Sequence, residues 1–376
     1  MLELKPMIHK FRMKDNYYCL DVNSGIIHVI DELIDRVLDI YDGTNRDAVH
    51  AALDAKEDAV ELDEIMDELD ELIKAEQLFA PMSKEFKLVV GEKPIVKALC
   101  LNIAHDCNLA CKYCFASQGD YGGVKREFHN AMRPVAGSGA ESYKYIAKNL
   151  VNAVKQRHGL EYYVRGTYTH KNLDFTKDVM AMSDLGFEHL SMEPVVGEEG
   201  DYVLREEDWP ALEKEYEKLA DIYLQRQLEG WGEKFNFFHF RMDLYRGPCM
   251  AKRLRGCGAG HEYMAIVPNG DIYPCHQFVG KDGYVLGNVY DGLQNTEIPK
   301  DFRNTHVFSK PICAECWAKF FCSGGCHANN ITLGGDLETP YEFGCRLQKK
   351  RIECAIMIQA ELEQAGIDGS IPVALG

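Results

Sequence analysis

Residues 95–114 read IVKALCLNIAHDCNLACKYC, and this stretch decides the fold class. Its first half, residues 95–105, is a near-continuous apolar run of the sort expected for a buried parallel strand. The loop that follows carries three cysteines in a C-x3-C-x2-C pattern and one aromatic residue: Cys107, Cys111, Tyr113 and Cys114. Three thiolates from one loop can hold three irons of a cubane cluster and leave the fourth iron without a protein ligand. Zinc is the alternative, with His105 as its fourth ligand.

Downstream lies a second group of cysteines: Cys249, Cys257, Cys275, Cys313, Cys316, Cys322, Cys326 and Cys345. The chain has 14 cysteines, and cytoplasmic cysteines stay reduced, so metal sites explain them better than a disulfide framework does. The turn at residues 268–271 (PNGD) is expected to bring Cys257 and Cys275 together. Gly324 and Gly325 are expected to let the backbone between Cys322 and Cys326 wrap close to the sulfide of a cluster. Zinc ribbons that use His276 and His327 are the alternative.

Strands and helices alternate around these groups. Residues 8–30 read as three short strands of an antiparallel sheet, and residues 31–43 and 62–73 read as helices. Further on, 161–170 and 189–196 look like buried strands, 142–157 and 174–186 like helices, and 352–365 like an amphipathic helix. This pattern indicates an α/β chain with a βα layer and is typical of part of a barrel. Cys19 and Cys100 lie in strands and are expected to be small buried apolar residues.

Composition limits the partners. The 376 residues carry a formal charge of −17, which argues against nucleic acid or an anionic membrane as the main partner. Residues 54–76 hold eleven Asp or Glu against two Lys, either as a solvated helix face or as a docking surface. No apolar run reaches the roughly 20 residues needed to cross a bilayer, and we find no signal peptide, so a cytoplasmic location is predicted.

The first loop resembles the signature of the radical S-adenosylmethionine (SAM) superfamily, in which the open iron binds SAM. The spacing of the second group resembles the SPASM domain, which holds two auxiliary clusters in peptide-modifying members of that superfamily. The resemblance implies three [4Fe-4S] clusters. It assigns Cys313, Cys316, Cys322 and Cys345 to one auxiliary cluster, and Cys257, Cys275 and Cys326 to the other. Cys249 is the expected fourth ligand of the cluster that Cys257, Cys275 and Cys326 hold, unless that cluster keeps an open iron.

Five stretches together resemble the thioether-forming maturases of six-cysteine (SCIFF) peptides, namely residues 101–123, 162–175, 191–196, 253–280 and 313–330. The N-terminal region resembles a PqqD-like, winged-helix recognition element for a leader peptide. The implied domains are a recognition domain (1–85), a radical SAM core (94–240), a SPASM domain (241–350) and a C-terminal helix and tail (351–376). In one respect the chain departs from this family. No Gly-Gly-Glu-Pro motif occurs, and after Gly123 the second to fourth βα units of the barrel are missing, so a partial barrel is expected.

The resemblance implies an enzyme that links cysteine sulfur to carbon in a ribosomally made, cysteine-rich precursor with a basic leader. Electrons would come from a reductant such as ferredoxin or flavodoxin. Two alternatives stay open: a non-catalytic leader-binding or electron-carrying iron-sulfur protein, and another SPASM enzyme such as a sulfatase-type maturase. Arg165, Tyr168 and Glu193 lie on strand-like segments and are either site residues or core partners. No catalytic residue is assigned.

Overall fold

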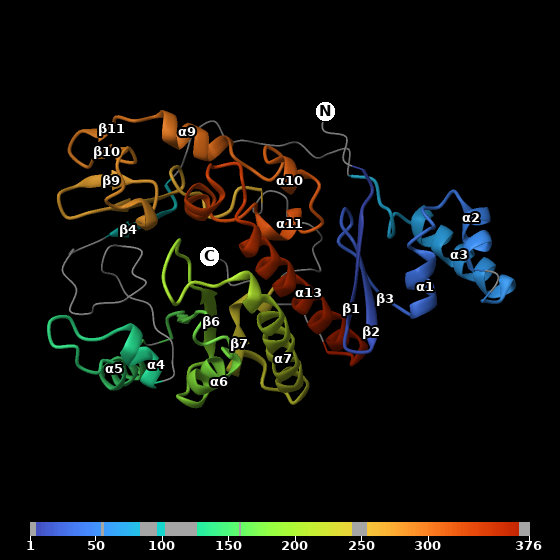
Figure 1. Ribbon diagram of the computed structural model, residues 1–376, viewed down its shortest axis with the longest axis horizontal. Coiled ribbons are helices and arrows are strands. Elements are labelled where there is room, and N and C mark those ends of the chain that lie inside the picture. The colour runs from blue at the N-terminus through green and yellow to red at the C-terminus, as the bar shows by residue number, and fades with distance from the viewer. Residues whose placement is uncertain are drawn as a thin grey trace.

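The computed structural model describes residues 5–53, 56–82, 96–101, 126–157, 159–242 and 254–367. The predicted loop with Cys107, Cys111, Tyr113 and Cys114 therefore lies outside the described residues, and so does Cys249. Figure 1 shows an N-terminal unit beside one long C-terminal helix, with a parallel sheet and a cysteine-rich unit on the other side of that helix.

The N-terminal unit begins with an antiparallel sheet of β1 (Ile8–Met13), β2 (Asn16–Asp21) and β3 (Ile27–Ile30), in the order β1-β2-β3. The three predicted strands are thus confirmed. Helices α1 (Glu32–Val37), α2 (Arg46–Leu53) and α3 (Ala59–Lys74) follow. Residues alternate along β2: Cys19 packs against these helices, whereas Tyr18 and Leu20 belong to the main core.

The helix predicted over residues 31–43 is wrong at its C-terminal end, because α1 stops at Val37. The chain continues in turns that still pack inward, so that Tyr41 is 1% exposed. The Asn45 side-chain amide donates to the carbonyl of Ile40 at 2.9 Å, so that this carbonyl is paired without a helix. Apolar spacing alone cannot distinguish these turns from helix.

The middle of the chain forms a parallel sheet of β5 (Val164–Tyr168), β6 (His189–Pro194) and β7 (Asn236–Phe237). Its helices are α4 (Arg126–Met132), α5 (Tyr143–Gln156), α6 (Thr176–Asp184) and α7 (Trp209–Leu228). The strands predicted within 161–170 and 189–196 and the helices predicted within 142–157 and 174–186 are confirmed. Buried aromatic and aliphatic side chains of β5, β6 and α7 form the main core.

The cysteine-rich unit contains β4 (Ala98–Leu101), β8 (Tyr263–Ile266), β9 (Asp271–Tyr273), β10 (Gly287–Asn288) and β11 (Gly292–Leu293), in the sheet order β11-β10-β9-β8-β4. Short helices follow: α9 (Glu297–Asn304), α10 (Pro311–Ala314), α11 (Lys319–Cys322) and α12 (His327–Asn329). The predicted turn is confirmed, because Gly270 has φ +89° between the antiparallel β8 and β9. A left-handed backbone at that position favours glycine.

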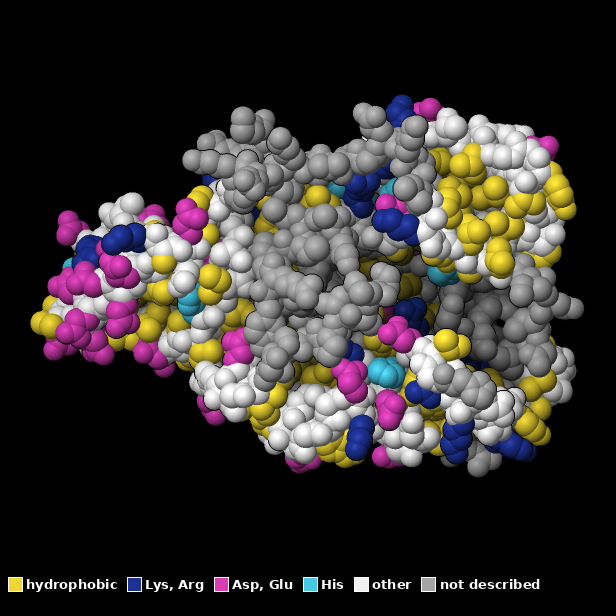
Figure 2. Space-filling model, turned by 180° about the vertical axis from the view of Figure 1, so that it is seen from behind, with side chains coloured by type: hydrophobic (Ala, Val, Ile, Leu, Met, Phe, Trp, Pro, Cys, Tyr) yellow, Lys and Arg dark blue, Asp and Glu magenta, His cyan; other side chains and the backbone are white. Residues whose placement is uncertain are grey.

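The expectation of a buried strand in residues 95–105 is wrong for β4. Leu99 is 52% exposed and Leu101 is 62% exposed. β4 pairs in parallel with β8 and, within the described part of the chain, shares no sheet with β5, β6 and β7. Cys100 is only partly buried for the same reason. Figure 2 shows apolar side chains gathered on the surface of the lobe that holds this sheet.

Helix α13 (Glu342–Gln364) joins the three units (Figure 1). The predicted C-terminal helix over residues 352–365 is confirmed, but it starts earlier, at Glu342. The carboxylate of Glu361 accepts hydrogen bonds from Tyr18 Oη and Asn16 Nδ2, both at 2.7 Å. His9 of β1 stacks on Trp317 with ring centroids 3.6 Å apart. No helix in the described ranges has both the length and the apolar character to span a membrane.

Candidate functional site

The described cysteines of the C-terminal unit gather in two groups. Group A consists of Cys257, Cys275 and Cys326, and group B of Cys313, Cys316, Cys322 and Cys345. Burial raises the pKa of Cys275 to about 12, and negative charge on Cys326 and Cys257 adds to that rise. In group B, burial raises the pKa of Cys345 to about 12, with contributions from Cys322, Cys313 and Cys316. Electrostatic coupling of this kind requires proximity, so each group is a cluster of neighbouring thiols.

Backbone N–H groups are aimed at these sulfurs. The N–H groups of Gly324 and Gly325 donate to Cys322 and act against the rise in its pKa that burial causes. The loop that makes this possible has three consecutive left-handed residues, Ser323 (φ 65°), Gly324 (φ 78°) and Gly325 (φ 81°). Glycine adopts such left-handed angles without strain. A Cβ on Gly325 would lie 2.9 Å from Asn330 Oδ1, so a side chain there would also be crowded.

Group A has similar donors. Ala328 and Asn329 donate their N–H groups to Cys326, and the Gln277 side chain donates to its sulfur at 3.6 Å. Cys275 accepts from the N–H groups of Gln277 and Phe278. Each donor set starts a short helical segment, where N–H groups have no intrahelical partner. Such donors favour thiolate over thiol.

These residues fit iron-sulfur clusters. The described cysteines are all free thiols, and those of groups A and B have neighbouring sulfurs and N–H donors. In a cubane each thiolate binds a different iron, and N–H donors to sulfur are one of the features that tune such clusters. Within the described ranges, no three His, Cys, Asp or Glu side chains converge tightly enough for a single metal ion. His276 and His327, the zinc alternatives, have their pKa lowered by burial.

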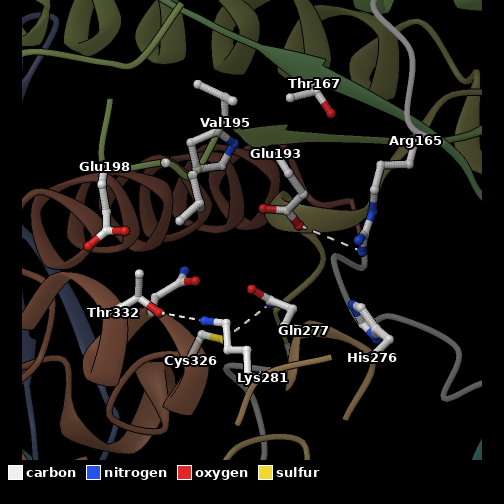
Figure 3. A pocket seen from close by; sticks show the side chains of 14 residues that line it. Arg165, Thr167, Glu193, Val195, Glu198, His276, Gln277, Lys281, Cys326 and Thr332 are labelled. Carbon is white, nitrogen blue, oxygen red and sulfur yellow. Dashed lines mark hydrogen bonds and ion pairs between the residues drawn. The ribbon is translucent and has the colours of Figure 1, made fainter. Parts of the chain in front are cut away.

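A pocket of about 400 Å³ lies between the parallel sheet and the cysteine-rich unit. One wall comes from β5 and β6 and the segment after β6, with Arg165, Thr167 and Glu193. The opposite wall carries Cys326 of group A and Lys281. Figure 3 shows these side chains facing one another across the pocket. The pocket therefore offers a bound molecule charged groups of both signs beside the thiol of Cys326.

A second cavity of about 370 Å³ adjoins the first. Cys322 and Cys345 of group B and Cys326 of group A all line it, and Glu193 lines both cavities. Glu193 and Cys326 thus both line the two cavities. The position of Glu193 at the C-terminal end of β6 is where parallel α/β sheets commonly bind ligands.

Glu193 is held by two arginines and one histidine. Arg351 of α13 lies 3.3 Å from its Oε2, His239 Nε2 lies 3.2 Å from its Oε1, and Arg165 lies 3.8 Å from the same oxygen. Burial alone would raise the pKa of Glu193, but the charges of Arg351, His239 and Arg165 outweigh it and hold that pKa well below its usual range. Burial and the Arg351 charge lower the pKa of His239. The carboxylate is therefore a fixed negative charge.

The other predicted candidates are either pocket residues or core residues. Arg165 lines the pocket, whereas Tyr168 is 0% exposed, and its hydroxyl bonds that of Tyr216 at 2.8 Å. Tyr168 is thus a core partner. Cys19 is the predicted small buried residue, with a pKa raised to about 12 chiefly by burial.

Sequence reasoning missed Arg351, His239 and Lys310. The side chain of each is polar and largely buried, that of His239 being 8% exposed, and such a residue shows no motif in a single sequence. The sequence signal for Arg351 was that it directly precedes residues 352–360, which are largely apolar.

Known proteins resemble parts of this chain. Residues 257–317 match the SPASM family, described as an iron-sulfur cluster-binding domain. Over 130 residues the chain is 32% identical to mycofactocin maturase MftC of Mycolicibacterium smegmatis, which covers 31% of this chain and 32% of that protein. Over 96 residues it is 33% identical to MftC of Mycobacterium tuberculosis, covering 23% of each. The chain thus matches about a third or less of the length of these curated relatives.

Among solved structures, anSMEcpe with bound AdoMet and the Cp18Cys peptide superposes with a TM-score of 0.56 at 16% identity, over 71% of this chain and 99% of that one. Native anSMEcpe with bound AdoMet gives a TM-score of 0.51 at 16% identity, over 94% of this chain and 91% of that one. At such low identity the likeness concerns the fold.

Proposed function

We propose that this chain is a cytoplasmic radical SAM maturase that forms thioether cross-links in a ribosomally made, cysteine-rich precursor peptide. The observation that carries this proposal is the pocket in which Cys326 of group A faces Glu193 and Arg165 of the parallel sheet. The SPASM match over residues 257–317 and the fold shared with a protein solved with AdoMet and a peptide support it. The partial match to mycofactocin maturases points to peptide chemistry as well.

In this proposal three [4Fe-4S] clusters are held by cysteine. Cys107, Cys111 and Cys114, with Tyr113 beside them, hold the cluster that binds SAM. Group B holds one auxiliary cluster, and group A together with Cys249 holds the other. When bound and reduced by ferredoxin or flavodoxin, the first cluster and SAM supply the radical that removes hydrogen from a peptide carbon.

The residues of the pocket bind and orient the peptide. Glu193, kept ionised by its partners, accepts hydrogen bonds from peptide N–H groups, and Arg165 and Lys281 donate to peptide carbonyls or carboxylates. Lys281 already donates to Thr332 at 3.0 Å, which fixes its direction along the pocket wall (Figure 3). A peptide cysteine in this pocket would lie next to the group A sulfur of Cys326.

The N-terminal unit supplies the leader site in this proposal, as a PqqD-like recognition element. A peptide can add as a strand to an outer strand of the sheet, β1 or β3, through main-chain hydrogen bonds. The exposed face of α3 carries acidic side chains, among them Glu61, Glu64 and Glu68, and Figure 2 shows acidic residues gathered on this lobe. A basic leader would be steered toward that surface.

The direct test is an anaerobic reaction of the cluster-loaded chain with dithionite, SAM and a cysteine-rich peptide that carries a lysine-rich leader. We expect 5′-deoxyadenosine to form and the peptide to lose two hydrogen atoms for each bridge. A peptide whose cysteines are replaced by serine is the matched control, and its mass should stay unchanged. If neither 5′-deoxyadenosine nor a mass change is found, the proposal is wrong.

A second candidate is a non-catalytic protein that binds the leader and carries electrons. The observation that favours it is β4, which, among the described strands, pairs with β8 and not with the β5-β6-β7 sheet, and which exposes Leu99 and Leu101. A closed barrel would cover such side chains. This candidate predicts leader binding and loaded clusters without release of 5′-deoxyadenosine, so the same reaction separates the two.

A further inference from the structure

Two lysines are buried beside group B. Lys310 is 1% exposed and Lys319 is 2% exposed. Lys310 Nζ donates to the carbonyl of Gly324 at 2.6 Å, and Lys319 Nζ lies 3.9 Å from Met7 Sδ. In the part of the chain that the structure describes, neither ammonium has a carboxylate partner. A buried charge without a partner is costly, so these positions call for a nearby negative charge.

Lys310 is fixed between the two groups of thiols. Its carbonyl accepts the N–H groups of Cys313 and Ala314, both at 3.0 Å, so its backbone begins the turn that carries the first cysteine of group B. Its side chain ends at Gly324, in the loop between Cys322 and Cys326. Asn330 Nδ2 donates to the carbonyl of Gly324 at 3.2 Å and holds that loop in place.

As thiolates, the cysteines near Lys310 would supply this negative charge. Burial lowers the pKa of Lys310, and charge on Cys313, Cys322, Cys345 and Cys326, in that order, opposes the fall. Three of these four belong to group B. Lys319 behaves in the same way, since burial lowers its pKa and charge on Cys316 opposes the fall.

We propose that Lys310 is the built-in counter-charge of the group B cluster and raises its reduction potential. The inference rests on the proposed function in one respect, that group B holds an iron-sulfur cluster. A fixed positive charge stabilises the more negative, reduced form of a cluster more than the oxidised form. Lys310 therefore acts through the cluster, and we expect a smaller effect on group A, because Cys326 contributes least of the four cysteines that act on Lys310.

The test is a redox titration of the cluster-loaded chain, followed by electron paramagnetic resonance. Lys310→Gln removes the charge and keeps a donor for the Gly324 carbonyl, whereas Lys310→Arg keeps the charge. Lys300→Gln, at an exposed lysine of α9, is the control for a general loss of charge. We expect Lys310→Gln to lower the reduced-to-oxidised ratio of the group B cluster about tenfold at a fixed potential, which is about 59 mV for one electron. Lys310→Arg and Lys300→Gln should stay near the wild type.

Each outcome decides the question. If Lys310→Gln fails to retain the group B cluster while Lys310→Arg retains it, the charge is needed for loading, which also supports the proposal. Equal potentials in Lys310→Gln and the wild type, or loss of the cluster in both variants, overturn it. Iron and sulfide content of the wild type is measured first. A wild type without auxiliary clusters refutes the proposed function itself, whereas loaded clusters with unmoved potentials refute only the role of Lys310.

Discussion

The guanidinium of Arg351 lies 3.3 Å from the carboxylate of Glu193, although the two residues are 158 positions apart in the chain. The same guanidinium donates to Met192 O at 3.1 Å and to Tyr216 Oη at 2.8 Å. Arg351 thus ties α13 to the end of β6 and to α7. Through this pair the C-terminal helix sets the position of the carboxylate that faces the pocket.

Replacing Arg351 by Met is expected to destabilise the protein by about 3 kcal/mol, because it leaves a largely buried carboxylate without its main partner. Urea unfolding measures the change. Arg346→Met, which breaks a more exposed pair with Glu206, is the matched control and should cost about 1 kcal/mol or less. If both variants lose a similar free energy of unfolding, the Arg351 pair contributes no more to stability than the exposed pair.

The depressed pKa of Glu193 predicts a pH dependence. Its folded pKa lies below the unfolded value of about 4.3, so its stabilising charge is fully present above about pH 4.3 and is lost as the pH falls further. Glu193→Gln lacks this contribution. We therefore expect the gap in melting temperature between wild type and Glu193→Gln to narrow from pH 7 to about pH 3.5. A constant gap would contradict the depressed pKa. The comparison uses cluster-free protein, since acid releases iron.

Cys326→Ser should remove the group A cluster and lower the iron content by about four per chain. Cys354→Ala is the control, because Cys354 is 0% exposed in the core and belongs to neither group. Its iron content should equal that of the wild type. Iron and sulfide assays after anaerobic reconstitution decide the matter, and unchanged iron in Cys326→Ser would exclude that residue as a ligand.

Reversing charge on α3 should weaken the binding of a lysine-rich leader. For the double variant Glu64→Lys and Glu68→Lys we expect about tenfold slower association at low ionic strength, with the difference shrinking at high salt. Stopped-flow fluorescence with a labelled leader peptide measures the rate. Glu229→Lys, at an exposed position at the end of α7, is the control and should bind like the wild type. If the double variant on α3 associates with the leader as fast as Glu229→Lys does, the leader binds elsewhere.

Short-range patterns carried much of the sequence prediction. The three N-terminal strands, the helix α3 and the turn at Gly270 depend on residues that are close in the chain, so periodicity and turn chemistry were enough to predict them. The division of cysteines into groups A and B came from the SPASM resemblance and stays a prediction.

The sequence by itself determined which residue types are available, namely the spaced thiols, the glycines between them and the acidic helix. Only the tertiary structure decided that β4 pairs with β8 and exposes its leucines, that Arg351 holds Glu193, and that Lys310 is buried between the thiol groups. These depend on contacts between distant segments, and burial changes the energy of a charged group far more than its neighbours in sequence do. An apolar run or a lone lysine reads the same in a sequence whether or not a partner covers it.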